Sequence, residues 1–349
     1  MSGTSLDGVD AACLLTDGVD ICEFGPSVYR PYSAAERQMI QGVLGKWPGA
    51  PGLEPVSKLI MAAHLEAWSQ LPPAALIGFH GQTLCHDPQN SRTHQLGSGS
   101  ELARRAGTAV AWDFRSEDVG CGGQGAPLAP IFHWALARYK QIEEPMAIVN
   151  LGGVGNLTWI DARLPAEQGL LAFDTGPANA PLNDFMMKTT GHPYDVGGAL
   201  AASGRVDEEL VALFLQRPYF SRSAPKSLDR DSFSDMVELV AQLAPADAAA
   251  TLTALCVAAI EAALPLIPVQ PKQVWISGGG RKNIEIMRQL AMKLPMKVYD
   301  IDDIGLDGDM LEAQAFAYLA ARVARGLATS FPATTATKAP LCGGKISLP

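Results

Sequence analysis

Short apolar runs and longer amphipathic stretches alternate along the chain. The short runs hold four or five consecutive apolar residues, as buried strands do, whereas the longer stretches repeat apolar positions every three or four residues, as helices do. Their alternation along the sequence predicts an α/β fold. The predicted strands are Ala11–Leu15, Leu76–Phe79, Ala109–Trp112, Met146–Asn150, Leu157–Ile160, Leu170–Phe173, Val274–Ser277 and Lys297–Tyr299.

The amphipathic stretches between these runs predict the helices. One stretch, Ala248–Leu264, is apolar enough to resemble a membrane span, but Asp247, Glu261 and the prolines that follow interrupt it. We therefore expect a buried helix there and no membrane partner. The other predicted helices are Ala34–Leu44, Pro55–Gln70, Ser100–Ala106, Pro127–Arg138, Ala180–Thr189, Asp207–Gln216, Ser232–Gln242, Ile284–Lys293 and Leu311–Arg325.

Composition narrows the class of protein. The 349 residues are enough for two domains, and 48% of them are hydrophobic. The net charge is −9 and no basic block stands out, which argues against a nucleic-acid partner. A small anionic ligand remains compatible, because backbone amides bind phosphate without net positive charge. The six scattered cysteines form no CxxC pair, so we expect reduced thiols and a cytoplasmic protein.

Two glycine-rich, polar segments flanked by apolar runs predict hairpin tips. One is Ser2–Asp10 and the other is Asn150–Thr158. Two such tips in one chain suggest a duplicated scaffold with both tips facing one ligand. The second tip marks a second domain, so we expect domains at 1–144 and 145–349.

These tips offer consecutive backbone amides and hydroxyls, which suit phosphate oxygens, although an ordinary turn remains the alternative for each. A third loop, Gly278–Gly280, lies between a predicted strand and a predicted helix, where a flat ring or a phosphate could lie on the backbone. None of the three is a P-loop or a GxGxxG fingerprint. The candidate nucleotide-binding residues are Gly3, Thr4, Ser5, Leu6, Asp7, Gly8, Val9, Asp10, Gly152, Gly153, Asn156, Gly278, Gly279 and Gly280.

Asp174 is the candidate catalytic residue. It ends a predicted apolar strand beside a Gly-Pro turn, where a general base could sit, although an Asx-turn or a helix N-cap would also explain it. His80 and Gln82 follow another strand and could hold a hydroxylated ligand, or could simply be hydrogen-bonded within the scaffold. Arg115 lies in a polar strand-to-helix loop. Glu312 opens an Ala/Leu-rich helix, where it could face a cleft or complement the helix dipole.

Taken in order, these motifs resemble those of the anhydro-N-acetylmuramic acid kinases, which belong to the actin–hexokinase ATPase superfamily. The motifs that carry the resemblance are Met1–Asp10, His80–Thr83, Gly122–Pro127, Asn150–Asn156, Phe173–Asn179, Pro225–Ser227 and Gly278–Asn283. The resemblance implies two duplicated, ribonuclease H-like domains that flank a nucleotide and sugar cleft. It also implies a homodimer.

The implied activity is ATP-dependent opening and phosphorylation of 1,6-anhydro-N-acetylmuramic acid to N-acetylmuramic acid 6-phosphate and ADP, with Mg²⁺, in peptidoglycan recycling. Asp174 would take a proton from the water that attacks the anomeric carbon, and O6 would then attack the γ-phosphoryl group. The first two loops would hold phosphates and Gly278–Gly280 the adenosine. The implied sugar ligands are His80, Gln82, Arg115 and Glu312.

The chain departs from the family pattern in three places. The family has an apolar strand before the Ser-Gly-Thr-Ser loop, whereas only Met1 precedes it here, so we expect either that the sequence begins too late or that the first domain lacks that strand and is weakened. The usually basic stretch after Phe114 reads Arg115-Ser116-Glu117-Asp118. The stretch Ser227–Arg230 carries Leu-Asp where a small Thr-Gly pair is usual.

Two alternatives to the kinase remain open. The levoglucosan kinases share the fold and act on a 1,6-anhydro sugar without lactyl and acetamido groups, and the change at Ser116-Glu117 is compatible with such a substrate. A non-catalytic sensor of sugar or nucleotide would keep the fold without the chemistry. The presence of Asp174 and of all three glycine-rich loops argues against a sensor.

Overall fold

The computed structural model describes residues 1–3, 5–228 and 230–349, so the phosphate-loop candidate Thr4 and the change at residue 229 lie outside the described residues. The fold is mixed α/β, as predicted, and the chain divides into two compact units. The first unit comprises 1–141 together with 310–349, and the second comprises 142–309. The expected second domain, 145–349, differs from the second unit, because residues 310–349 pack with the first unit.

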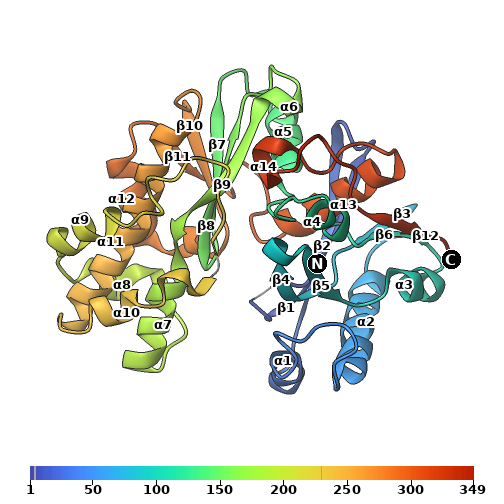
Figure 1. Cartoon of the computed structure of the whole chain (residues 1–349), viewed down its shortest axis with the longest axis horizontal. Coiled ribbons are helices and arrows are strands. Elements are labelled where there is room, and N and C mark those ends of the chain that lie inside the picture. The colour runs from blue at the N-terminus through green and yellow to red at the C-terminus, as the bar shows by residue number, and fades with distance from the viewer. Residues whose placement is uncertain (4, 229) are drawn as a thin grey trace. The chain divides into compact units, whose positions relative to one another are not determined.

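The second unit is built on one five-stranded sheet with the order β11-β10-β7-β8-β9 (Figure 1). β7, β10 and β11 are parallel, and β8 runs antiparallel to both of its neighbours. This is the strand order of a ribonuclease H-like domain. The strands are β7 (Met146–Leu151), β8 (Val154–Ile160), β9 (Leu170–Pro177), β10 (Gln273–Ser277) and β11 (Lys297–Asp300).

Helix α11 (Pro245–Ala263) forms the centre of the second unit's cores. One of its faces packs against β9 and β8, in a core that β7 and β10 also line, and another packs against the smaller helices. Its apolar span, Pro245–Leu266, has a mean hydropathy of 1.8 and is 72% buried, which confirms the predicted buried helix. The other helices are α6 (Ala166–Gly169), α7 (Asn179–Thr190), α8 (Ala199–Ala202), α9 (Glu208–Leu215), α10 (Met236–Leu239) and α12 (Ile284–Lys293).

The first unit has three small sheets in place of one large sheet. β1 pairs with β2, β6 pairs with both β3 and β12, and β4 pairs with β5. The strands are β1 (Gly8–Thr16), β2 (Ile21–Pro31), β3 (Leu76–Phe79), β4 (Gln82–Asp87), β5 (Arg92–Leu96), β6 (Ala109–Trp112) and β12 (Lys345–Ser347).

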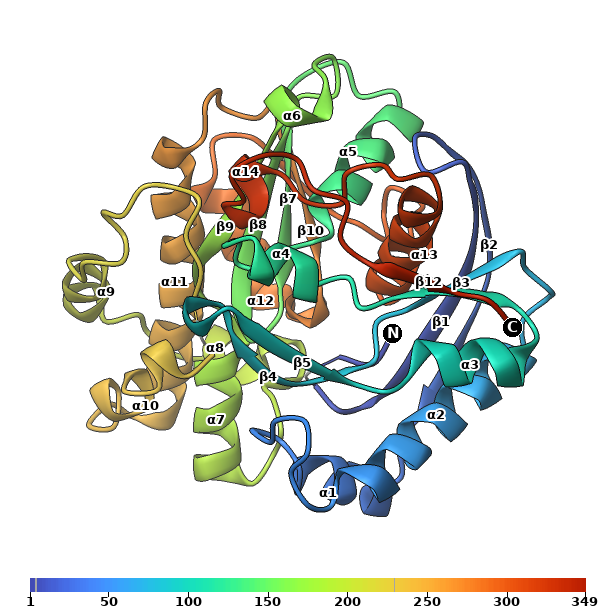
Figure 2. The same ribbon diagram turned by 45° about the vertical axis from the view of Figure 1, so that its right-hand side comes forward.

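The C-terminal segment belongs to the first unit because its elements complete that unit. Helix α13 (Leu311–Ala324) packs against β1 and β3, and β12 extends the β3–β6 sheet (Figure 2). The other helices of this unit are α1 (Ala34–Gln41), α2 (Leu53–Ser69), α3 (Gly99–Ala106), α4 (Ser116–Gly120), α5 (Pro130–Tyr139) and α14 (Pro332–Thr335).

Every predicted strand is present, but three local predictions were wrong. The first predicted hairpin tip, Ser2–Asp10, ends earlier than expected, because its last residues Gly8–Asp10 already belong to β1. The second, Asn150–Thr158, is reduced to 152–153, because the residues on either side already belong to β7 and β8. The predicted helix Ser232–Gln242 is broken into short pieces, because its first residues end the 3-10 helix Arg230–Phe233 and only Met236–Leu239 form an α-helical turn, α10. Phe233 and Met236 pack into a core from these two short helices.

Candidate active site

Asp174 lies within β9, directly opposite Asn156 of β8. The pairing register shifts between Gly155 and Asn156, which leaves an additional residue, Thr175, on the β9 side. A bulge of this kind bends the strand and redirects the neighbouring side chain. The Asn156 Nδ2 donates to Asp174 Oδ1 at 2.9 Å, and the Leu228 backbone amide donates to Oδ2 at 2.7 Å. Each carboxylate oxygen is therefore fixed by one donor and keeps lone-pair capacity for a proton.

Among the described residues, Asp174 does not fill the role of a helix cap, one of the two structural alternatives to catalysis. The first amides of α7, those of Asn179 and Ala180, bond to the carbonyls of Gly152 and Gly153, so Asp174 does not cap that helix. Burial raises the pKa of Asp174, while the hydrogen bonds from Asn156 and Leu228 lower it in part. A half-buried carboxylate with a raised pKa is a stronger base than one in water.

The backbone of Asp174 is held by a segment that follows much later in the chain. The Tyr219 hydroxyl donates to the Asp174 carbonyl at 2.5 Å, and the Asp174 amide donates to the Lys226 carbonyl at 2.9 Å. Lys226 Nζ donates to the Tyr219 carbonyl at 3.0 Å and lies 4.3 Å from the centre of the Tyr219 ring. Burial lowers the pKa of Lys226 to about 8. Sequence reasoning missed Tyr219, because nothing in its local pattern indicates a partner 45 residues away.

The glycine loops that follow β7 and β10 lie against each other in the second unit. Gly278 has φ +77°, and a β-carbon there would overlap the Asn150 Oδ1 and the Leu151 carbonyl. Gly279, by contrast, has nothing within 4 Å of an added β-carbon, so its backbone is open. The carboxyl ends of neighbouring parallel strands are where open α/β sheets bind ligands. The loops at 152–156 and 278–280 therefore form one candidate surface.

In the first unit, Gln82 holds the predicted phosphate loop in place. Its Oε1 accepts from the Ser2 hydroxyl at 2.6 Å, and its Nε2 donates to the Gly3 carbonyl at 3.2 Å. Gln82 is fully buried. In this arrangement it positions the loop, and its predicted contact with the sugar stays a prediction. Further along the loop, Arg37 donates to the Leu6 carbonyl and Tyr29 donates to the Asp7 carbonyl.

His80 and Arg115 form a buried polar pair. The Arg115 Nε donates to His80 Nε2 at 3.0 Å, and His80 Nδ1 lies 2.9 Å from the Gly81 carbonyl. Burial and the charge of Arg115 hold the pKa of His80 well below its usual range, so the ring is neutral, with its proton on Nδ1. Burial lowers the pKa of Arg115 to about 10, which leaves the guanidinium charged at neutral pH. Glu312, exposed at the start of α13, lies close enough to favour that charge.

The sequence profile described as anhydro-N-acetylmuramic acid kinase matches residues 1–348. The chain belongs to the anhydro-N-acetylmuramic acid kinase family. Among its relatives, the anhydro-N-acetylmuramic acid kinase of Cereibacter sphaeroides is 53% identical over 100% of this chain and 95% of its own length. Anhydro-N-acetylmuramic acid kinase 1 of Jannaschia sp. is 51% identical over 100% of this chain and 94% of its own length.

Solved structures resemble the chain more distantly than these relatives do. A ROK family glucokinase from Streptomyces griseus, in complex with glucose and AMPPNP, is 14% identical with a TM-score of 0.41, and the match covers 93% of this chain and 97% of the glucokinase chain. The activator of the 2-hydroxyisocaproyl-CoA dehydratase from Clostridium difficile is 15% identical, also with a TM-score of 0.41 and 93% of each chain covered.

The stretch after Phe114, which departs from the family pattern, includes a residue that anchors a neighbouring loop. Asp118 is fully buried and accepts from the Gly125 amide at 2.6 Å and from the Thr335 hydroxyl at 2.7 Å. It therefore anchors the loop at 122–125. Ser116 bonds to Asp113, and Glu117 is exposed on α4. Sequence reasoning placed Asp118 in a polar loop but could not assign this anchoring role, because Thr335 is 217 residues away in the chain.

Proposed function

We propose that this chain uses ATP to open 1,6-anhydro-N-acetylmuramic acid and to phosphorylate its O6, giving N-acetylmuramic acid 6-phosphate and ADP. The observation that carries the proposal is the Asp174 carboxylate, fixed at both oxygens by Asn156 and Leu228 in a member of this kinase family. The relatives described above are named for the muramyl sugar. The levoglucosan kinase and the non-catalytic sensor are therefore not favoured.

In the proposed reaction, Asp174 accepts a proton from the water that attacks the anomeric carbon. The bond from that carbon to the bridging oxygen breaks, and its electron pair stays on O6. O6 then attacks the γ-phosphorus of ATP as the bond to the ADP oxygen breaks. The raised pKa of Asp174 supports its role as the base, and the two donors fix the direction of its free lone pairs. Most of the remaining catalysis is alignment and charge stabilisation.

The nucleotide is proposed to bind the glycine loops. Gly3–Asp10 and Asn150–Asn156 would hold phosphates, and Gly278–Gly280 would hold the adenosine. The open backbone at Gly279 supports this assignment, because a flat ring can lie directly on it. Within the described residues no group of three His, Cys, Asp or Glu side chains is arranged as a metal site. Proteins bind Mg²⁺ largely through substrate phosphates and one or two carboxylates. Asp7, exposed in the first loop, offers such a carboxylate.

The sugar is proposed to contact His80, Gln82, Arg115 and Glu312. Arg115 is the cation of this set, and the muramyl sugar differs from levoglucosan in carrying a lactyl carboxylate. The direct test is therefore coupled ADP release with the two sugars side by side. ADP release with the muramyl sugar alone would support the proposal. ADP release with levoglucosan alone would identify levoglucosan as the substrate in place of the muramyl sugar. ADP release with neither sugar would overturn the kinase assignment.

Arg115→Gln should raise KM for the muramyl sugar by about 10- to 100-fold, because it removes a charged hydrogen bond to the substrate carboxylate. Arg115→Lys should recover part of the loss, since it keeps the charge without the planar fork. The readout is KM for the sugar at saturating ATP, with KM for ATP as the internal control. An equal rise in both constants would contradict a direct contact with the sugar, because Arg115 also bonds to Gly125 within the scaffold.

Asn156→Ala should move the acid limb of the kcat profile to higher pH. Burial raises the pKa of Asp174 and the hydrogen bond from the Asn156 amide lowers it, so removing this amide should raise the pKa of Asp174 further. The rate requires the carboxylate and is lost as pH falls through this pKa. At neutral pH kcat should also fall about tenfold, because a hydrogen bond to a charged group is lost. The exposed Asn90→Ala serves as the control, and an unshifted limb would contradict the role assigned to Asp174.

The cysteines bear on the cellular setting of the protein. All six cysteines are free, which supports a reducing compartment and hence a cytoplasmic location. A homodimer is expected from family resemblance, and light scattering of the purified protein would test it. Peptidoglycan recycling is the process in which this reaction would serve.

A further inference from the structure

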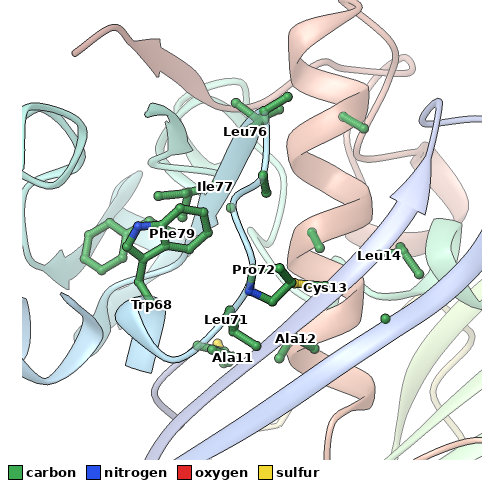
Figure 3. A pocket seen from close by; sticks show the side chains of 18 of the residues that line it. Ala11, Ala12, Cys13, Leu14, Trp68, Leu71, Pro72, Leu76, Ile77 and Phe79 are labelled. Atoms are coloured by element: carbon green, nitrogen blue, oxygen red, sulfur yellow. The ribbon is translucent and has the colours of Figure 1, made fainter. Parts of the chain in front are cut away.

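Two features outside the proposed reaction differ in the chemistry that they offer. A groove of about 530 Å³ in the first unit is lined mostly by apolar side chains, among them Leu14, Trp68 and Phe79 (Figure 3). In the second unit, Lys226 is only 7% exposed and lies in the motif Pro225–Ser227, to which the proposed reaction assigns no role. The lysine, unlike an apolar lining, can donate hydrogen bonds and carry charge.

Both the backbone and the ring of Tyr219 contact the Lys226 ammonium group. Its Nζ donates to the Tyr219 carbonyl at 3.0 Å and lies 4.3 Å from the centre of the ring, within the range of a cation–π contact. A lysine this deeply buried is almost always paired. Because the paired residues are seven positions apart in the chain, their contacts close the segment 219–226 into a loop.

Both ends of this loop hold Asp174. At the first end, the Tyr219 hydroxyl donates to the Asp174 carbonyl at 2.5 Å. At the second end, the Lys226 carbonyl accepts from the Asp174 amide at 2.9 Å. Two residues later, the Leu228 amide donates to Asp174 Oδ2 at 2.7 Å. The Lys226 ammonium group thus joins the two points from which Asp174 is held.

Packing fixes the first end of the loop more firmly than the second. Tyr219 and Phe220 are buried in an apolar core of the second unit, whereas Leu228 is only partly buried at the edge of that core. The residues on either side of Lys226 are exposed, and so is the stretch 221–223. Because exposed backbone gains little from packing, the contacts of Lys226 with Tyr219 provide much of the attachment of the second end.

The Lys226 ammonium group is charged at neutral pH in spite of its burial. Burial, together with the charge of the exposed Arg222, lowers the pKa of Lys226 to about 8, which leaves most of the side chain protonated at neutral pH. A charged donor makes a stronger hydrogen bond to a carbonyl than a neutral donor does. The bond from Lys226 to the Tyr219 carbonyl is therefore suited to hold a segment that is otherwise exposed.

We propose that Lys226 is a positioning residue for the proton-accepting Asp174. By closing the loop on Tyr219, it keeps the Leu228 amide on the Asp174 carboxylate, and it acts through that amide without contacting the reacting atoms. The assignment rests on the proposed function, in which Asp174 takes the proton from the attacking water. It also gives the motif Pro225–Ser227 a role in the reaction.

Loss of the ammonium group should change the Asp174 carboxylate in a defined direction. Burial raises the pKa of Asp174, and the hydrogen bond from the Leu228 amide lowers it. Without the contacts of Lys226, the second end of the loop moves away and Oδ2 loses this donor. The pKa of Asp174 should then rise, and the carboxylate should lose its fixed orientation.

The test compares the full chain with Lys226→Met, which keeps an apolar stem of similar length and removes the ammonium group. Replacing a buried charge by an apolar side chain of similar volume is often neutral in stability, so we expect the variant to fold, and a thermal melt checks this. The first readout is the pKa of Asp174, followed through the NMR chemical shift of its carboxyl carbon and assigned by its absence in Asp174→Asn. We expect a rise of about one pH unit, the equivalent of one hydrogen bond to a charged group.

The second readout is steady-state ADP release with the muramyl sugar. In Lys226→Met, kcat at neutral pH should fall about tenfold, and its acid limb should move with the pKa of Asp174. KM for the sugar and KM for ATP should stay within about twofold of the wild type, because no contact with either substrate is removed.

Two further substitutions at Lys226 and one control complete the test. Lys226→Arg, which keeps a cation that can donate to the Tyr219 carbonyl, should recover part of kcat. Lys226→Gln, which keeps only a neutral donor, should shift the pKa of Asp174 in the same direction as Lys226→Met but by less. Arg222→Met removes an exposed cation near the Tyr219 ring and should leave both readouts unchanged.

A lower melting temperature of Lys226→Met with an unchanged pKa of Asp174 would overturn the proposal, because the role of Lys226 would then be structural only. An equal rise in this pKa with Arg222→Met would also overturn it, since loss of any nearby cation would then suffice. A changed KM with a normal pKa would overturn it by making Lys226 a substrate ligand. If the wild type releases no ADP but the pKa still rises in Lys226→Met, the proposed function fails while the positioning of the Asp174 carboxylate stands.

Discussion

Asp174→Asn should lower kcat for the muramyl sugar by about 10²- to 10⁴-fold, the range expected when a general base is removed. The amide cannot accept the water's proton, and its NH₂ group faces a donor, Asn156 or the Leu228 amide, in place of an acceptor. The measurement is steady-state ADP release at saturating sugar and ATP, with a thermal melt to show that the fold persists.

The control for this variant is Asp184→Asn, the same substitution at an exposed aspartate of α7 in the same unit. It should leave kcat within a factor of about two, since surface substitutions usually have small effects. If Asp174→Asn keeps more than a tenth of the wild-type kcat, Asp174 is not the base. The Asn156 prediction would then lose its basis as well.

Gly278→Ala should destabilise the second unit by about 2–4 kcal/mol and lower its melting temperature by roughly 5–15 °C. Gly278 has φ +77°, and a β-carbon would overlap the Asn150 side chain and the Leu151 carbonyl. Because backbone atoms line the overlap, the loop after β10 must move. Binding of nucleotide to that loop should weaken together with stability.

Gly279→Ala separates these two effects. Its φ is not in the left-handed range, and an added methyl group meets nothing within 4 Å. Stability should stay within about 0.5 kcal/mol of the wild type. KM for ATP should nevertheless rise, because the methyl group occupies the surface proposed for the adenosine. A normal KM for ATP would show that the adenosine lies elsewhere.

The central strands of the second unit could be predicted from sequence because burial on both faces requires unbroken apolar runs. Met146–Asn150 and Val274–Ser277 are such runs, and both are strands. The strand β2 was missed, because its sequence holds Gly25, Pro26 and several exposed polar residues, as suits a partly solvated edge. The strand conformation of β2 depends on its pairing with β1 more than on its own composition.

The site residues that were predicted show a local sequence pattern, whereas those that were missed depend on contacts with residues far away in the chain. Asp174 was predicted because a carboxylate ending an apolar strand is locally conspicuous, and the structure places it opposite Asn156. Tyr219 and Thr335 act on residues 45 and 217 positions away, and such contacts leave no local pattern. Gln82 was predicted as a polar residue that follows a strand. Its burial and its hydrogen bond to the loop at Gly3 depend on the tertiary fold and could not be predicted from the local sequence.

The division of the chain into units also orders events during synthesis. The second unit is continuous, 142–309, so all of its parts are available before the last segment is made. The first unit begins the chain, yet it lacks α13 and β12 until residues 310–349 have been added. The half of the protein that is translated first is therefore the half that can be completed only last. Truncation at the C-terminus would damage the N-terminal unit and spare the second.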